Sequence, residues 1–213
     1  MLTTLLVLAP LSANAADAFH SKSQNLEVRV GPATLSDSSI TTVYGETGNQ
    51  FFYLQSGLQL YRSLELDAEI GLLRESDPAV GADSGEESGY MTRISLLPVS
   101  LSATVRLDLF DNQPIVPFAT GGVDYWLFTE QLNTGEGYLM GTSTNGGKPG
   151  YHYGFGANLL LDLFSRERAS RAEARWGIQD SYLVVEYRIQ EMLSDDGLDF
   201  SGSVLSAGLK IDR

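Results

Sequence analysis

The sequence predicts an all-β fold: an eight-stranded antiparallel up-and-down β-barrel that crosses a membrane. Between Leu64 and Leu72 every second residue is apolar, and acidic residues or glycine fill the positions between them. Neighbouring side chains of a β-strand point to opposite faces, so this segment has one apolar and one acidic face. Eight alternating segments can be found along the chain, and the polar connections between them are long and short in turn. That combination is typical of barrels that span membranes.

The first four strands are expected at residues 26–32, 51–61, 64–72 and 97–107. In each of them leucine, valine and other apolar residues alternate with residues that are mostly charged, polar or small. Pro98 lies in the fourth segment, and proline has no N–H group to donate to a β-ladder. We therefore expect a β-bulge at this residue.

The last four strands are expected at residues 115–127, 151–161, 182–189 and 203–211. A short helix at the periplasmic rim, of about two turns, is expected near residues 165–175. This segment has alanines at helical spacing, contains neither glycine nor proline, and offers Ser165 as an N-cap. Its arginines could contact anionic lipid headgroups, or the helix could simply be solvated.

The polar connections follow the rhythm of a membrane barrel, with long outer loops and short periplasmic turns. Long stretches are expected at residues 34–48, 74–90, 128–150 and 192–201, and short ones near residues 62–63, 111–113 and 165–176. The first three long stretches are rich in glycine, serine, threonine, asparagine and acidic residues, as solvated loops are. A soluble β-sandwich gives no reason for this alternation of lengths.

Composition excludes several classes of function. The chain has 213 residues, a length that suits one domain, and contains no cysteine, which excludes disulfides and thiolate chemistry. Its formal net charge of −13 argues against binding to nucleic acid, which requires clusters of lysine and arginine. There is no glycine-rich nucleotide loop and no histidine–cysteine cluster. We expect no cofactor and no bound metal.

The N-terminus predicts export. The apolar residues 2–11 are followed by Ala13 and Ala15, the small-x-small pattern that signal peptidase reads. The expected organisation is a signal peptide at 1–15, a flexible segment at 16–25 and one barrel domain at 26–213; the alternative at the N-terminus is a short buried helix. No later apolar run reaches the roughly 20 residues that a membrane helix needs. A membrane protein with this sequence must therefore be a barrel, because only helices and closed barrels satisfy their backbone in lipid.

Aromatic residues gather near the ends of the expected strands, as in the two girdles of a membrane barrel. The candidate girdle residues are Phe52, Tyr125, Trp126, Tyr153, Phe164 and Trp176. The alternative is that these residues cap the two ends of a soluble core.

The polar faces of the strands carry charges of both signs, and we expect these to form a charge network in the lumen. The candidates are Glu27, Arg29, Glu65, Asp67, Glu69, Arg106, Asp124, Glu186, Arg188 and Lys210. Charges inside a narrow barrel must pair or form hydrogen bonds to remain ionised. The network could be a polar plug that holds the barrel shut. It could also line a narrow, cation-favouring passage or a site for a small ligand.

Catalytic residues are scarce. His20 and His152 are the only histidines; Asp124 and Ser143 could approach His152, but no spaced nucleophile–base pattern supports a triad. Two groups of loop acids lack the spacing of an EF-hand and are interpreted as solvated. They are Asp77, Asp83, Glu86 and Glu87 in one loop, and Asp195, Asp196 and Asp199 in another. We expect that the protein is not an enzyme.

With these features together, the chain resembles the small eight-stranded outer-membrane barrels of Gram-negative bacteria, typified by the OmpA transmembrane domain and OmpW. The resemblance rests on the signal peptide and on residues 97–107, 117–123, 154–157 and 206–209. It implies an outer-membrane protein with a structural or small-solute passage role and long extracellular loops. Such barrels usually end on an aromatic residue, whereas this chain ends Lys-Ile-Asp-Arg.

The partners expected from this hypothesis are outer-membrane lipid, lipopolysaccharide and the barrel-assembly machinery. We expect a monomer; the sequence indicates no ligand. The alternative hypothesis is a soluble periplasmic barrel that binds an apolar ligand, as lipocalins do, with its leucine, isoleucine and valine face pointing inward. A third, an outer-membrane lipid enzyme, would depend on His152.

Overall fold

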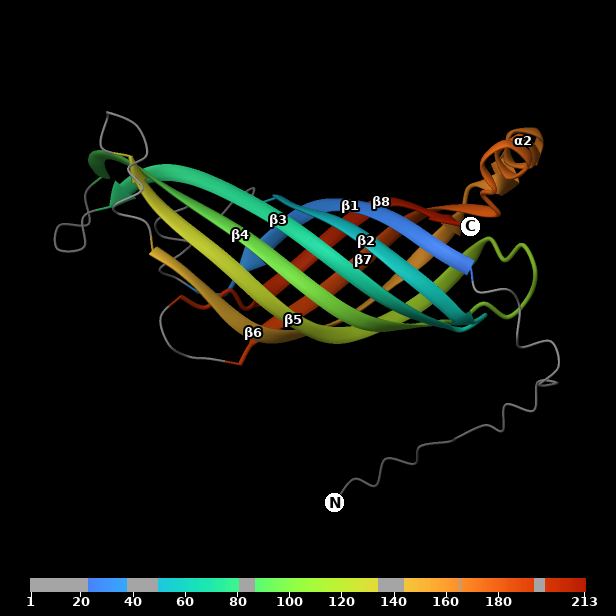
Figure 1. The fold of residues 1–213 in the computed structure, drawn as a ribbon, viewed down its shortest axis with the longest axis horizontal. Coiled ribbons are helices and arrows are strands. Elements are labelled where there is room, and N and C mark those ends of the chain that lie inside the picture. The colour runs from blue at the N-terminus through green and yellow to red at the C-terminus, as the bar shows by residue number, and fades with distance from the viewer. Residues whose placement is uncertain (1–22, 38–49, 81–86, 134–143, 165, 194–197) are drawn as a thin grey trace, which may run out of the picture.

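Eight strands form one closed antiparallel barrel in the computed structural model of the protein (Figure 1). The structure describes residues 23–37, 50–80, 87–133, 144–164, 166–193 and 198–213. Each strand pairs with the next along the chain, and β8 closes the barrel against β1. The elements are β1 (Ser23–Leu35), β2 (Gln50–Tyr61), β3 (Leu64–Val80), β4 (Glu87–Arg106), β5 (Ile115–Asn133), β6 (Thr144–Leu160), η2 (Asp162–Phe164), α2 (Arg166–Trp176), β7 (Asp180–Met192) and β8 (Gly202–Asp212). The fold class predicted from the sequence is confirmed.

The apolar faces of the strands point outward. Leu101 on β4 and Val123 on β5 are directly paired across the two strands, and each is 63% exposed. Leu26, Leu54, Ile70, Phe155, Val185 and Leu205 on the other strands are likewise exposed. The alternate residues point into the barrel, whose eight strands leave an interior just wide enough for side chains to fill. This orientation is the reverse of the one that a lipocalin-like barrel requires.

The strands at the loop end are longer than predicted. Much of the expected polar stretches 74–90 and 128–150 belongs to paired strands, as in the register pairs Ser76–Arg93 and Thr129–Asn145. Their ladders carry polar side-chain contacts, such as the hydrogen bond from Arg93 Nε to Ser76 Oγ at 3.1 Å. Beyond the apolar belt the outward face of a hairpin need not be apolar, so the alternation in hydrophobicity weakens while the strand continues. β1 also begins at Ser23, before the expected start at residue 26.

The β-bulge expected at Pro98 is absent. β3 and β4 keep one register from Ile70–Val99 to Leu73–Leu96, with Pro98 between these pairs and opposite Trp126 of β5. Pro98 points inward, over Gly71 of β3, where any side chain would collide with the proline ring. The missing side chain of Gly71, rather than an extra residue, makes room for the proline.

The turn end of the barrel carries α2, which lies beyond the barrel wall on the same end as the C-terminus (Figure 1). The helix ends at Trp176 and is followed by Gly177, whose φ of 68° and N–H bond to the Glu173 carbonyl at 2.9 Å form a left-handed C-cap. At the same end Arg62 links two turns through ion pairs to Asp108 at 3.1 Å and Asp111 at 3.0 Å. The hydrogen bond to Asp108 raises the pKa of Arg62. No described helix has the length and apolar character needed to span a membrane.

Candidate functional site

The ten charged residues selected from the sequence all lie inside the barrel, and their exposed fractions range from 0% to 7%. They come from six strands. β1, β3 and β7 each contribute at least two, and β4, β5 and β8 contribute one each. The strict alternation of each strand places these side chains inward, and closure of the barrel brings strands distant in sequence to face one another. The interior is therefore the candidate functional site.

Five of these residues form a central cluster around two guanidinium groups. Arg29 contacts Glu27 at 2.6 Å through Nε and Glu186 at 2.5 Å through Nη1. Arg188 contacts Glu186 at 2.7 Å. Glu69 pairs with both arginines. Three carboxylates from three strands thus surround two arginines, the pairing that buried charges need.

An aromatic ring covers this central cluster. The Tyr53 ring centroid lies 5.5 Å from the guanidinium carbon of Arg29 and 5.2 Å from that of Arg188, within the range of cation–π contacts. Gln55, on the same face of β2, accepts a hydrogen bond from Arg29 Nη2 at 3.1 Å. Tyr53 and Gln55 were not among the residues predicted for the network, although both lie on the predicted polar face of the second strand.

A second cluster lies around Glu65, which is fully buried. One carboxylate oxygen of Glu65 accepts from Arg106 Nη1 at 2.5 Å, and the other accepts from Lys210 Nζ at 2.5 Å. Arg106 also contacts Asp212 at 3.2 Å, and its guanidinium carbon lies 5.3 Å from the centroid of the Tyr182 ring. Asp212 was missed because the expected eighth strand ended one residue before it.

The two remaining acids are held by neutral groups or by histidine. Asp67 accepts a hydrogen bond from Thr104 Oγ1 at 2.8 Å, and Asp124 contacts His152 Nδ1 at 2.7 Å. The other ring nitrogen of His152 is buried and makes no hydrogen bond within the described part of the chain. His20 and Ser143 lie outside the described residues. Thus the described contacts of His152 include an acid but no hydroxyl nucleophile.

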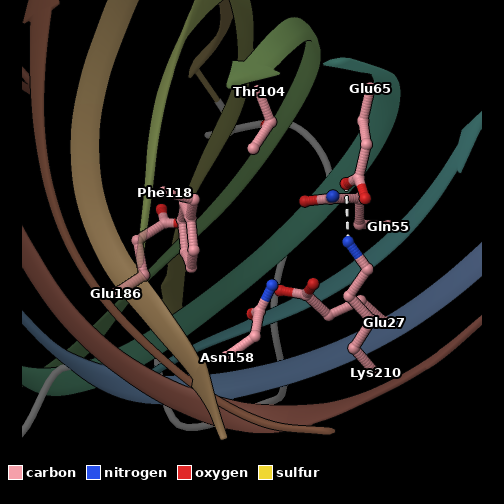
Figure 2. Close-up of a pocket in the computed structure, with 8 residues that line it drawn as sticks. All are labelled: Glu27, Gln55, Glu65, Thr104, Phe118, Asn158, Glu186 and Lys210. Carbon is pink, nitrogen blue, oxygen red and sulfur yellow. Dashed lines mark hydrogen bonds and ion pairs between the residues drawn. The ribbon is translucent and has the colours of Figure 1, made fainter. Parts of the chain in front are cut away.

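Between the two clusters remains a cavity of about 10 Å³, which holds about one water molecule. Figure 2 shows the residues that line it, with the ion pair between Lys210 and Glu65 marked. They are Glu27, Gln55, Glu65, Thr104, Phe118, Asn158, Glu186 and Lys210, and they project inward from the surrounding strands. In this conformation the interior side chains fill the centre of the barrel.

A buried apolar cluster occupies the interior nearer the loop end. Trp126 packs edge-on against Phe51, with ring centroids 5.5 Å apart, and stacks on Phe200 at 5.9 Å. The assignment of Trp126 to an aromatic girdle is therefore wrong: this residue is 1% exposed and shares the inward face of β5 with Asp124. The other five girdle candidates are exposed: Phe52, Tyr125, Tyr153, Phe164 and Trp176.

No group of three or more histidine, aspartate or glutamate side chains in the described ranges could hold a metal ion. Four of the loop acids considered from the sequence lie outside the described residues: Asp83, Glu86, Asp195 and Asp196. The side chains of Asp77 and Glu87 lie outside the described part as well. Asp199 is described, and its Oδ1 accepts hydrogen bonds from the backbone N–H and the hydroxyl of Ser201.

No protein-family model matches the chain, and no curated protein sequence matches it. Among solved structures, the outer membrane protein OprG from Pseudomonas aeruginosa is similar over 90% of this chain and 96% of its own, with 10% identity and a TM-score of 0.60. A second similar structure is that of Ail, the attachment invasion locus protein of Yersinia pestis, in complex with the heparin analogue sucrose octasulfate. It matches over 91% of this chain and all of its own, with 11% identity and a TM-score of 0.54.

Neisserial surface protein A is similar over 89% of this chain and 96% of its own, with 15% identity and a TM-score of 0.51. At such identities the similarity shows a common fold. The chain thus has the fold of the small eight-stranded outer-membrane barrels, and the resemblance drawn from its sequence is confirmed at that level.

Proposed function

We propose that this protein resides in the bacterial outer membrane as a closed barrel, with a structural role and loops presented at the cell surface, rather than passing solutes. The observation that carries the proposal is the filled interior, where only about 10 Å³ remains between two clusters of ion pairs. A passage for ions needs a continuous water-filled path, as wide barrels provide.

The outward belt supports the membrane location. Exposed leucine, valine, isoleucine and phenylalanine side chains occur on all eight strands, an apolar surface far larger than soluble monomers usually expose. Exposed aromatic residues toward both ends of the barrel, such as Phe52 toward the loop end and Trp176 at the turn end, suit the two lipid–water interfaces. Export by a signal peptide at residues 1–15 is part of the same proposal, as are lipopolysaccharide and outer-membrane lipid as surroundings.

The closed interior has two layers, which supports a structural role further. The charged clusters occupy the centre, and the apolar cluster around Trp126 and Phe200 lies between this centre and the loop end. An ion entering from the loop end would first meet buried aromatic rings and then paired charges. Loss of either set of contacts would cost stability, because each set satisfies or packs the groups around it.

The test is a conductance recording on the mature protein refolded in detergent and reconstituted into planar bilayers. A shift in gel mobility between unheated and heated samples verifies that the barrel has folded, and mass measurement in detergent tests the expected monomer. We expect insertion without steady conductance. A steady conductance from the folded protein would overturn the closed barrel, and a protein that stays soluble without detergent would overturn the membrane location.

A further inference from the structure

Helix α2 packs against η2 but makes few contacts with the strands in the described part of the chain. Every described side chain of α2 is exposed except that of Ala172, which is half-buried. The helix has 11 residues, and isolated helices shorter than about 12–15 residues are only marginally stable in water. A helix of this length usually owes its stability to a surface on which one of its faces packs. For α2, that surface must come largely from outside the barrel.

The sequence of α2 has two distinct faces. Residues three or four positions apart share one face of an α-helix. Arginine occupies positions 168, 171 and 175, and alanine or tryptophan occupies positions 169, 172 and 176. The two stripes lie side by side around the helix, because each alanine or tryptophan comes directly after one of these arginines in the chain. A basic stripe beside an apolar stripe is the pattern of a helix lying in a membrane interface.

Charge strengthens this interpretation. The segment 166–176 holds four arginines and two glutamates, whereas the whole chain has a net charge of −13. Arg171 pairs with Glu167, but their side chains are 74% and 79% exposed, and exposed pairs of this kind contribute little. The guanidinium carbon of Arg175 lies 5.3 Å from the centroid of the Trp176 ring. Both arginines can therefore turn toward an anionic surface at small cost.

Aromatic residues bracket the helix. Phe164, just before α2, is 85% exposed, and Trp176, its last residue, is 60% exposed. At the same end of the barrel the turn between β4 and β5 exposes Leu109 and Phe110. Exposed aromatic side chains at the level of the turns suit the boundary between lipid tails and headgroups. They place this end of the barrel, and α2 with it, at such a boundary.

We propose that α2 lies on the periplasmic leaflet of the membrane and binds anionic phospholipid headgroups through Arg171 and Arg175, with Trp176 inserted at the interface. The inference rests on the proposed membrane location and names a lipid-binding surface for it. The apolar stripe and the bracketing aromatic residues favour a lipid surface over a soluble acidic partner, which would need only the charges.

The two tryptophans of the chain make the test specific. Trp126 is buried inside the barrel and Trp176 is on α2, so a Trp126→Phe protein reports from the helix alone. This protein is refolded into vesicles of phosphatidylcholine, with or without phosphatidylglycerol. Trp176 fluorescence is then measured with a neutral aqueous quencher and with lipids brominated on their acyl chains. We expect phosphatidylglycerol to shift the emission to shorter wavelength, to lower quenching from water and to raise quenching from lipid.

Arginine variants in the same background test the contacts. Arg171→Gln and Arg175→Gln should each lower the ratio of docked to undocked helix about fivefold in phosphatidylglycerol vesicles, the effect of one basic residue near an anionic surface. High salt should weaken docking of the unsubstituted helix. Arg62→Gln is the matched control: this arginine lies at the same end of the barrel, paired with Asp108 and Asp111, and its loss should leave Trp176 unchanged.

The two levels of the proposal fail differently. If the barrel inserts, shown by heat-modifiable mobility, while Trp176 remains equally open to the aqueous quencher in both lipids, the docking surface is refuted and the membrane location stands. An equal response to Arg62→Gln and Arg171→Gln would also refute it, since the effect would then be one of net charge. If the protein does not enter vesicles at all, both proposals fail.

Discussion

Replacing Glu65 by glutamine should destabilise the barrel strongly, because this one carboxylate pairs with two buried cations. Arg106 and Lys210 each donate to a different oxygen of Glu65 at 2.5 Å, and all three side chains are at most 3% exposed. In Glu65→Gln the amide keeps the shape and one acceptor but loses the charge. Lys210 then has no described ion-pair partner, while Arg106 keeps Asp212 at 3.2 Å.

The expected loss in the free energy of unfolding is about 3–5 kcal/mol, the usual cost of leaving a buried charge without its partner. The matched control is Glu167→Gln on α2, which removes the same chemical group from a pair whose side chains are 74% and 79% exposed. That variant should lose no more than about 0.5 kcal/mol. The two variants change net charge equally and differ chiefly in burial.

Urea unfolding of the protein in lipid vesicles, followed by tryptophan fluorescence and gel mobility, measures both variants. A double variant, Glu65→Gln with Lys210→Met, removes the stranded ammonium group as well. It should be more stable than the sum of the two single losses predicts, by about 1–3 kcal/mol. A loss below about 1 kcal/mol for Glu65→Gln, or strict additivity in the double variant, would refute the paired interior described above.

Three further changes test the belt, the apolar cluster and the close approach of two strands. Leu101→Lys, on the exposed apolar face of β4, should lower the free energy of unfolding in vesicles by about 2–4 kcal/mol. An unchanged midpoint of urea unfolding would contradict contact between this residue and lipid. Phe200→Ala empties a fully buried site and should lower the free energy of unfolding in urea by about 3–5 kcal/mol. Conductance should stay absent in this variant because the charged centre remains, and new conductance would contradict that expectation. Gly71→Val should lower the free energy of unfolding by about 1–3 kcal/mol, because the ring of Pro98 occupies the space that the valine side chain needs. An unchanged temperature for the shift in gel mobility would contradict this close approach.

The fold was largely predictable because hydrophobic alternation survives wherever a strand crosses the apolar belt. The period-two pattern from Leu64 to Leu72 fixes which residues share a face, and the structure keeps this assignment. The pattern cannot locate strand ends in water: Ser76 of β3 is paired with Arg93 of β4, but residues 74–77 include no apolar residue that would mark them as strand. The β-bulge at Pro98 was predicted wrongly, because the space left by Gly71 depends on a neighbouring strand.

The site was predictable as a set of inward charges but not as a set of pairs. Arg188 and Glu69 are 119 residues apart, and only closure of the barrel brings them into contact. The position of Trp126 was misjudged for a related reason: aromatic residues near a strand end suit either a girdle or a filled lumen, and the face decides. Asp124, two residues before Trp126, was predicted to point inward, and residues two apart in a strand share a face. This relation alone would have placed Trp126 inside the barrel.

The two layers of the interior act in series, and this decides what a passage would require. Moving only the aromatic rings of Phe51, Trp126 and Phe200 would remove the apolar layer but leave Tyr53 and the arginines that it covers in the path. Separating only the ion pairs leaves an apolar layer above, and leaves the separated charges buried at a cost of several kcal/mol. A conducting state would therefore need a coordinated rearrangement of side chains from at least five strands. Both layers also link strands across the barrel, so the side-chain interactions that would block ions add to the backbone pairing that closes the wall.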